Sequence, residues 1–248
     1  MPARIHLGCC GWSYLNEGEF PELGNLNREH SKLHAYAKLF DTVEINSTFY
    51  RLPRLSTAEK WRNEVDELNP EFEFTVKAFK GITHLHRFQK EESLNSYRSL
   101  KEICSALRTR FVLFQSPASF MPSRENINTM LEFFRKINRE GIAAVWEPRG
   151  KWYDDIKLIE RVCCDCKLVH CVDPFRNDPL TSGPTKTAYL RLHGFGKPSM
   201  YRYDFSNEEL RSLLKKVESL PAEMKDVYVF FNNDSCYHDA LAFMKLIG

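Results

Sequence analysis

Eight short apolar runs, rich in β-branched and aromatic residues, recur along the 248 residues of this chain. Buried parallel strands give near-continuous apolar runs, and most of the segments between them have the character of amphipathic helices. The runs are Ile5–Gly11, Thr42–Thr48, Glu73–Phe79, Arg110–Gln115, Ile142–Pro148, Leu168–Pro174, Ala188–Gly194 and Val227–Asn233. Eight strand–helix units in a chain of this length predict an α/β fold, a TIM (β/α)8 barrel that forms one domain over residues 1–248.

Local signals refine the helices of this barrel. Ser56 with Glu59, and Ser206 with Glu209, have the spacing of a capping box, so each pair predicts the start of a helix. The segment between the sixth and seventh runs, 175–187, is short and broken by two prolines and a glycine. We therefore expect an irregular loop, or a missing helix, after the sixth strand.

Composition excludes several classes of protein. A formal net charge of +2 is too small to indicate a nucleic-acid or membrane partner by itself, so such a role needs a local patch. No apolar stretch approaches the roughly 20 residues of a membrane span, and Met1–Leu7 has no signal-peptide core. We expect a cytoplasmic protein without a membrane partner, and the sequence leaves its oligomeric state open.

The alternation of side chains along a strand predicts which residues face the barrel interior. Val43, Ile45, Phe74, Leu190 and Leu192 suit the helix layer, which leaves polar neighbours on the inner side of three strands. These are Glu44, Asn46 and Thr48, then Thr75 and Lys77, then Tyr189, Arg191 and His193, while Gln115, Glu147, Asp173 and Asn232 end the other strands. Unpaired buried charges are too costly for a marginally stable domain, so these groups must pair with one another, a ligand or a metal. Because barrel sites lie where the strands end, we interpret them as a site rather than as packing alone.

Five segments of this sequence carry a family resemblance. They read GCCGWSY at Gly8–Tyr14, VEINSTFYRLP at Val43–Pro53, FTVKAFK with ITH at Phe74–His84, YLRLHG at Tyr189–Gly194 and YVFFNN at Tyr228–Asn233. Together they closely resemble the YecE-like family, a TIM-barrel domain of unknown function (number 72), over nearly the whole chain. The resemblance implies a barrel without the full set of outer helices and implies no established reaction. Its likeness to xylose-isomerase-type and endonuclease-IV-type barrels is an analogy of fold.

We expect two long loops, Trp12–Asn27 and Lys80–Lys90, at the mouth of the barrel. Basic and aromatic residues alternate beyond the second and third strands, up to and within the second of these loops. Basic groups neutralise phosphates, and aromatic faces stack on bases. The cations are Arg51, Arg54, Lys77, Lys80, His84, His86, Arg87 and Lys90, and the rings are Phe49, Tyr50, Phe79 and Phe88. The set predicts a phosphorylated small molecule or a nucleic acid as ligand, with a solvated loop as the alternative.

Two alternatives involve metals. Glu44, Glu147, Asp173 and His193 supply oxygen and imidazole ligands suited to a divalent cation, so such a cofactor stays open although we assign no metal ligands. Cys163, Cys164, Cys166 and Cys171 lie close in sequence, but one Cys-x-x-Cys pair without a second is weak support for an iron–sulfur cluster. We interpret these thiols as packing.

The favoured function is hydrolytic or lyase-type chemistry on a phosphorylated substrate or nucleic acid. In this hypothesis Arg191 and Lys77 hold the anion, Glu44 or Glu147 is the general base, and His193 transfers a proton. Two other roles are open to Lys77. Its amine could form a Schiff base, or, as we favour, its ammonium group could form an ion pair with Glu44. The catalytic set is Glu44, Lys77, Glu147 and His193, and the substrate-binding set is Asn46, Tyr50, Arg51, Lys80, His84, Arg149, Asp173, Arg191 and Asn232. A non-catalytic binding module and a sugar-phosphate isomerase are the alternatives.

Overall fold

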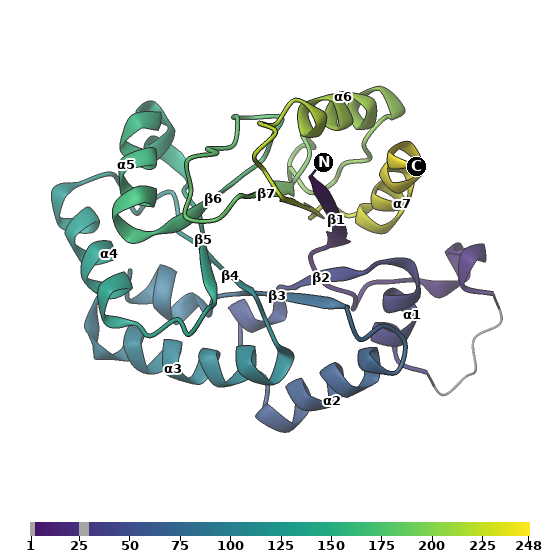
Figure 1. Ribbon diagram of the computed structural model, residues 1–248, viewed down its shortest axis with the longest axis horizontal. Helices are drawn as coiled ribbons and strands as arrows, with labels where there is room; N and C mark the ends of the chain where they lie inside the picture. The colour runs from purple at the N-terminus through teal and green to yellow at the C-terminus, as the bar shows by residue number, and fades with distance from the viewer. Residues whose placement is uncertain (1–2, 25–29) are drawn as a thin grey trace.

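The computed structural model describes residues 3–24 and 30–248, and in this part of the chain eight parallel strands close into a barrel in sequence order. Figure 1 shows the strands at the centre and the helices around them. The strands are β1 (Arg4–Cys9), β2 (Thr42–Ile45), β3 (Glu73–Lys77), β4 (Phe111–Gln115), β5 (Ala143–Glu147), β6 (Leu168–Val172), β7 (Thr187–Leu192) and β8 (Asp226–Phe231). The predicted TIM barrel is confirmed. Several strands end two or three residues earlier than predicted, so Asn46 and Thr48 follow β2 rather than lie in it.

Seven α-helices surround the strands in the described residues. They are α1 (Lys32–Leu39), α2 (Leu55–Asp66), α3 (Lys90–Leu107), α4 (Arg124–Lys136), α5 (Ile156–Cys166), α6 (Asn207–Glu218) and α7 (Cys236–Ile247). The chain passes from β6 to β7 through a loop without a helix, as predicted, which leaves the outer ring open between α5 and α6 (Figure 1). None of the helices in the described part of the chain has the length and apolar composition needed to cross a bilayer.

The two predicted capping boxes have different outcomes. At α6 the Ser206 side chain accepts from the Glu209 amide, and the Glu209 carboxylate accepts from the Ser206 amide, so this box is confirmed. The prediction at Ser56 is wrong, because α2 begins at Leu55 and Ser56 therefore lies inside its first turn. Arg54 is the N-cap and makes no capping bond with its side chain.

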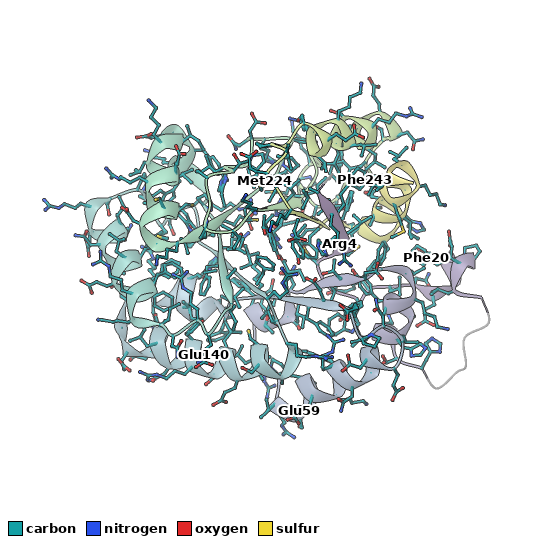
Figure 2. The ribbon with its side chains drawn as sticks, viewed as in Figure 1. Arg4, Phe20, Glu59, Glu140, Met224 and Phe243 are labelled. Carbon is teal, nitrogen blue, oxygen red and sulfur yellow. The ribbon has the colours of Figure 1, made fainter. Side chains whose placement is uncertain are left out.

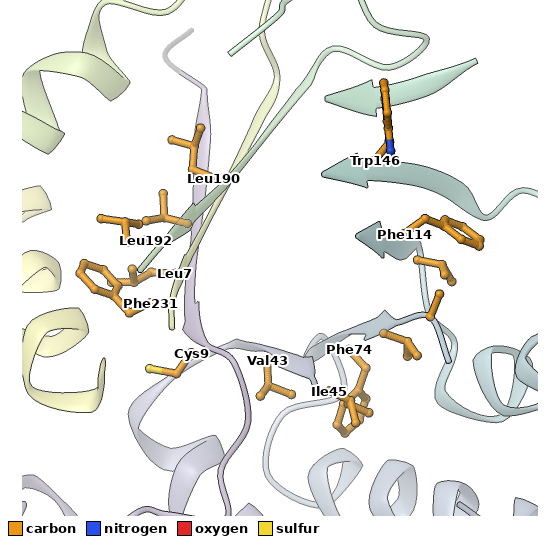
Figure 3. Packing of buried hydrophobic residues seen from close by; sticks show 14 of the residues in the cluster. Leu7, Cys9, Val43, Ile45, Phe74, Phe114, Trp146, Leu190, Leu192 and Phe231 are labelled. Atoms are coloured by element: carbon orange, nitrogen blue, oxygen red, sulfur yellow. The ribbon is translucent and has the colours of Figure 1, made fainter. Parts of the chain in front are cut away.

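Two apolar layers hold the barrel. The outer layer packs strands against helices, and Figure 3 shows Val43, Ile45 and Phe74 turned to one side of the sheet and Leu190 and Leu192 turned toward the helices. Inside the barrel a second, smaller cluster is built largely from aromatic and aliphatic residues. Its buried members are Phe111, Leu113, Val145, Val169, Cys171, Tyr189, Tyr228 and Phe230. The predicted alternation of facing is therefore confirmed, and long polar side chains such as Glu59 and Glu140 lie at the outer edge (Figure 2).

A polar cluster closes the end of the barrel where the strands begin. His6 stacks on Tyr228 with 4.2 Å between ring centroids, and its Nε2 lies 2.8 Å from an oxygen of Asp226. Glu73 accepts a hydrogen bond of 3.1 Å from Arg110 and another from the Tyr228 hydroxyl. These side chains belong to the starts of the strands, so this end is filled and the opposite end is left to form a site.

The seam between β1 and β2 uses a side chain in place of part of the strand ladder. The two strands pair at only two positions, Gly8 with Thr42 and Cys9 with Val43. The Tyr36 hydroxyl of α1 accepts from the Cys9 amide at 2.7 Å and donates to the Thr42 carbonyl at 2.8 Å. A Cβ atom at Gly8 would lie 2.1 Å from that carbonyl oxygen, so only glycine permits this approach.

Candidate functional site

A buried arginine on β7 organises the polar interior. Arg191 is 0% exposed, and its Nε and Nη2 donate to Glu44 Oε1 at 3.1 and 2.8 Å. Its Nη1 donates to Glu147 Oε2 at 2.6 Å, and Nη2 lies 3.5 Å from the Cys10 sulfur. Burial alone would lower the pKa of Arg191, but the carboxylates hold that pKa well above its ordinary value. One guanidinium thus joins carboxylates from opposite parts of the barrel, in the forked geometry that arginine provides.

The oxygens of both carboxylates are occupied. Glu44 also accepts from the Tyr189 hydroxyl at 2.8 Å and from the Cys10 thiol at 3.2 Å. Glu147 also accepts from Gln115 at 2.9 Å and pairs with Arg149. Burial would raise the pKa of Glu147, but Arg191 and Arg149 outweigh it and hold that pKa far below its usual range. An acceptor with its lone pairs committed and a strongly lowered pKa is a poor general base, so this geometry favours a supporting role for Glu147.

The predicted proton carrier, His193, is held as a neutral acceptor. Its Nε2 accepts from Arg149 at 2.9 Å, while Nδ1 lies 3.4 Å from an Asp173 oxygen. Burial lowers the pKa of His193, and the Arg191 and Arg149 charges lower it further, against the opposing effect of Asp173 and Glu147. The ring is 1% exposed, so any proton transfer to substrate first requires this contact with Arg149 to break.

A cavity of about 780 Å³ lies at the mouth of the barrel. Its walls come from residues that end or follow β1, β2, β3, β7 and β8, which the closed barrel brings together. Four predicted site residues line it: Asn46, Tyr50, Lys77 and Asn232. The Asn46 amide donates to Asn232 Oδ1 at 3.3 Å, which ties the ends of β2 and β8 across the cavity.

Lys77 is a buried titratable group in the wall of this cavity. It is 9% exposed, and its Nζ lies 4.5 Å from the centre of the Phe49 ring. Within residues 3–24 and 30–248 no carboxylate comes within ion-pair distance of Nζ, so the predicted pair with Glu44 is wrong and Arg191 holds Glu44 instead. Burial lowers the pKa of Lys77 to about 8, and the charge of Arg191 acts in the same direction. The Glu147 and Glu44 carboxylates only partly oppose this shift.

The remaining predicted binding residues lie outside the cavity lining. Arg51 is exposed next to Tyr50, and Lys80 Nζ lies 5.9 Å from the centre of the Tyr50 ring. His84 packs edge-on against Phe49 at 4.8 Å, and burial, together with the charge of Lys77, lowers its pKa.

Arg149 and Asp173 belong to the buried network rather than to the cavity. Asp173 accepts from the backbone amides of Phe175 at 3.1 Å and His193 at 3.2 Å. The predicted basic and aromatic set is only partly at the mouth, since Phe88 is buried against Phe120 and Phe133 of the outer layer. Part of the predicted loop Trp12–Asn27, residues 25–27, lies outside the described residues.

Sequence reasoning missed most of this lining, and four of the missed residues bear on the chemistry of the cavity. Cys10, Tyr14, Tyr201 and Arg202 all line it. Cys10 follows β1, and its thiol donates to Glu44 and accepts from Arg191. Burial, with the charge of Glu44, raises the pKa of this thiol well above its ordinary value, so the thiol is protonated. The other three lie on loops without a periodic pattern, and their signal is exposure, which only the fold supplies.

The other cysteines do not form a ligand group. Cys163, Cys164 and Cys166 lie at the end of α5 as free thiols, with Cys164 exposed, and Cys171 is buried in β6. Burial raises the pKa of Cys163 and raises that of Cys166 to about 12. Across the described ranges, no group of three or more His, Cys, Asp or Glu side chains is placed to hold a metal ion.

Comparison with known proteins agrees with the resemblance in the sequence. The UPF0759 protein YunF of Bacillus subtilis is 25% identical over 260 residues, which cover 93% of this chain and 89% of that protein. A DUF72 family protein of Thermotoga maritima superposes with a TM-score of 0.73 at 24% identity, over 98% of both chains. One from Enterococcus faecalis gives a TM-score of 0.74 at 20% identity, over 99% of this chain and 98% of that one. The family model described as "Protein of unknown function DUF72" matches residues 6–248, so this chain belongs to that family.

Proposed function

We propose that this protein is a lyase whose Lys77 amine forms a Schiff base with the carbonyl carbon of a phosphorylated substrate. The observation that carries the proposal is the position of Lys77, nearly buried at the wall of a 780 Å³ cavity and without an ion-pair partner in the described residues. Structural lysines in barrels are normally paired, because an unpaired buried ammonium is costly. A lysine kept unpaired beside an open cavity suits a reacting amine.

The lowered pKa of Lys77 matters because only the neutral amine is a nucleophile. With a pKa of about 8, about a quarter of Lys77 is neutral near pH 7.5, whereas an ordinary lysine is about 0.1% neutral. The buried network beneath the cavity supports this state. Arg191 lies among the causes of the shift, and its own charge is fixed by Glu44 and Glu147. The network is therefore assigned to tuning and positioning Lys77 rather than to holding the anion.

The chemistry proceeds in three balanced steps. The Nζ lone pair attacks the carbonyl carbon, and the carbinolamine takes up one proton from solvent and loses one water to leave a protonated imine. The protonated imine then accepts the electron pair of a neighbouring C–C bond, so that an enamine remains, and the departing carbon leaves as an aldehyde when its hydroxyl gives a proton to water. The enamine takes up a proton at carbon, and hydrolysis of the resulting imine returns the amine and the shorter carbonyl compound. His84 packs on Phe49, over which Lys77 Nζ also lies, so it is assigned to positioning Lys77 from outside the cavity.

The phosphate is assigned to cations at the rim. Arg202 lines the cavity and Arg51 lies next to Tyr50, and within the described residues neither side chain makes an ion pair. Lys80 lies against the Tyr50 ring. In contrast, the donors of Arg191 are engaged by Glu44, Glu147 and Cys10, so an anion bound there would have to displace them.

Trapping with borohydride tests the proposal. Triose, pentose and hexose phosphates with a free carbonyl are incubated with the protein, reduced with borohydride and analysed by peptide mass spectrometry. We expect an adduct on Lys77 with at least one of them, and none with Lys77→Arg, whose side chain keeps the charge but forms no imine. Lys60→Arg, at an exposed lysine of α2 outside the cavity lining, is the matched control and should leave the adduct unchanged. Labelling spread over exposed lysines, equal in Lys77→Arg, refutes the amine chemistry.

The second candidate function is a binding module without turnover. The closed set of contacts among Arg191, Glu44 and Glu147 favours it, because these groups satisfy one another without a ligand. Binding of a phosphorylated ligand with neither an adduct nor turnover in the same screen supports the module. Interconversion of two sugar phosphates without bond cleavage supports an isomerase.

A further inference from the structure

Exposed tyrosines gather around the cavity. Among the described residues, nine large hydrophobic side chains are strongly exposed, and three of them are tyrosines. These are Tyr14, Tyr50 and Tyr201, with 92%, 69% and 39% of their surface exposed. All three line the same cavity, although they come from the loops after β1, β2 and β7. We call them the rim tyrosines. Their convergence from three distant segments is not explained by packing, because exposed rings contribute little to the core.

Cations without ion-pair partners accompany the rim tyrosines. Arg202 follows Tyr201, Arg51 follows Tyr50, and Lys80 Nζ lies 5.9 Å from the Tyr50 ring. No ion pair holds any of these three side chains in the part of the chain that the structure describes. Asp234 lines the cavity too, so the named rim side chains carry three positive charges against one negative. A neutral glycan would stack on the rings but would leave the cations unused, whereas a polyanion with flat aromatic groups uses both.

We infer that the rim binds a single-stranded nucleic acid, with bases stacked on the tyrosines and phosphates on the three cations. A nucleotide that has lost its base, whose opened sugar has a free aldehyde carbon for the Lys77 amine to attack, then enters the cavity, and its neighbours remain on the rim. Unpaired strands are favoured over duplexes because stacking on side chains requires bases that are free of their partners. The inference rests on the proposed function for the reacting group, and it names the class of phosphorylated substrate. Binding and chemistry are measurable separately.

The test is fluorescence anisotropy with a labelled thymidine oligomer of about 12 nucleotides, which is within the site sizes known for such surfaces. We expect Tyr50→Ala and Tyr201→Ala each to raise Kd by about 5- to 150-fold, the range of one lost base stack. Tyr50→Phe should bind like the wild type, because the ring rather than the hydroxyl makes the stack. Ile247→Ala is the matched control, an exposed residue at the far end of α7, and should change nothing.

Salt and competitors complete the test. Arg202→Ala should reduce the slope of log Kd against log salt by about 0.7, the value for one phosphate contact on a single strand. The inference is overturned if the oligomer does not bind at about 50 mM salt, where phosphate contacts are strong. It is equally overturned if the alanine variants bind like the wild type, if a duplex binds as tightly, or if a neutral oligosaccharide displaces the oligomer.

The two proposals fail in different ways. Borohydride trapping of a small sugar phosphate on Lys77 is measured without the oligomer, and oligomer binding is measured without borohydride, so each result stands alone. Trapping without oligomer binding overturns the nucleic-acid inference and leaves the lyase intact. Tyrosine-dependent binding of the oligomer without trapping on Lys77 supports the surface and refutes the amine chemistry.

Discussion

Replacement of Arg191 by methionine tests whether the buried network is held together by this one cation. The guanidinium contacts Glu44 twice and Glu147 once, with all three groups at most 3% exposed. Glu147 keeps Arg149, but Glu44 makes no other ion pair in the described part of the chain. Breaking a buried pair costs about 3–5 kcal/mol, because an uncompensated charge remains. For a domain of this size that loss lowers the melting temperature by about 6–20 °C.

Urea unfolding of matched variants measures this effect. Arg202→Met removes an exposed arginine that makes no ion pair in the described residues, so it should change the free energy of unfolding by less than about 0.5 kcal/mol. Adding Glu44→Gln to Arg191→Met should recover much of the stability, because it removes the stranded charge. The reasoning is refuted if Arg191→Met costs under about 1 kcal/mol, or if the double variant is no more stable than the single one.

Three further predictions follow from single groups. The pKa of Lys77 is about 8 in the fold and about 10.4 in an unfolded chain, so the unfolded state binds more protons between these values and wild-type stability rises with pH there. Lys77→Met should therefore be more stable than the wild type near pH 7, by up to about 3 kcal/mol, with the difference closing by about pH 10.5; a constant difference in pH-resolved urea unfolding contradicts the shift. Ser206→Ala should lose about 1 kcal/mol in urea unfolding, whereas Ser56→Ala, which caps nothing, should stay within about 0.5 kcal/mol. Iodoacetamide should alkylate exposed Cys164 well before Cys10, whose thiol is bound to Glu44 and has a raised pKa; equal rates by mass spectrometry would contradict this.

The barrel and the facing of its residues could be predicted because both depend on local patterns. Apolar runs give the strands, and strict alternation gives the side on which Glu44, Lys77 and Arg191 lie. The depth at which each of these side chains lies within the barrel could not be predicted in the same way, because it depends on how the strands pair. The pairing of β2 with β3 places Glu44 beside Thr75, so Lys77 lies two residues nearer the mouth. That offset of about 6–7 Å separates Lys77 from Glu44, while the longer reach of Arg191 spans the interior.

Which loop residues line the cavity could not be predicted from sequence patterns, for a related reason. Phe88 alternates with basic residues in the sequence, yet its backbone turns it into the outer layer with φ of 64°. Tyr14 and Tyr201 belong to no periodic pattern, and they line the same cavity because of the paths of the loops after β1 and β7. Alternation and spacing describe regular elements, whereas a rim is assembled from irregular ones.

The hydroxyl bridge from Tyr36 makes the first helix part of the wall of the barrel. Where two strands pair along their whole length, the hydrogen bonds between them do not depend on the surrounding helices. Here the Cys9 amide and the Thr42 carbonyl are bridged by a side chain of α1, so an outward movement of that helix would break this link between β1 and β2. Cys10 directly follows Cys9, and Glu44 lies two residues after Thr42 in β2. A disturbance of α1, on the outside of the molecule, therefore has a short covalent route to the charges beneath the cavity.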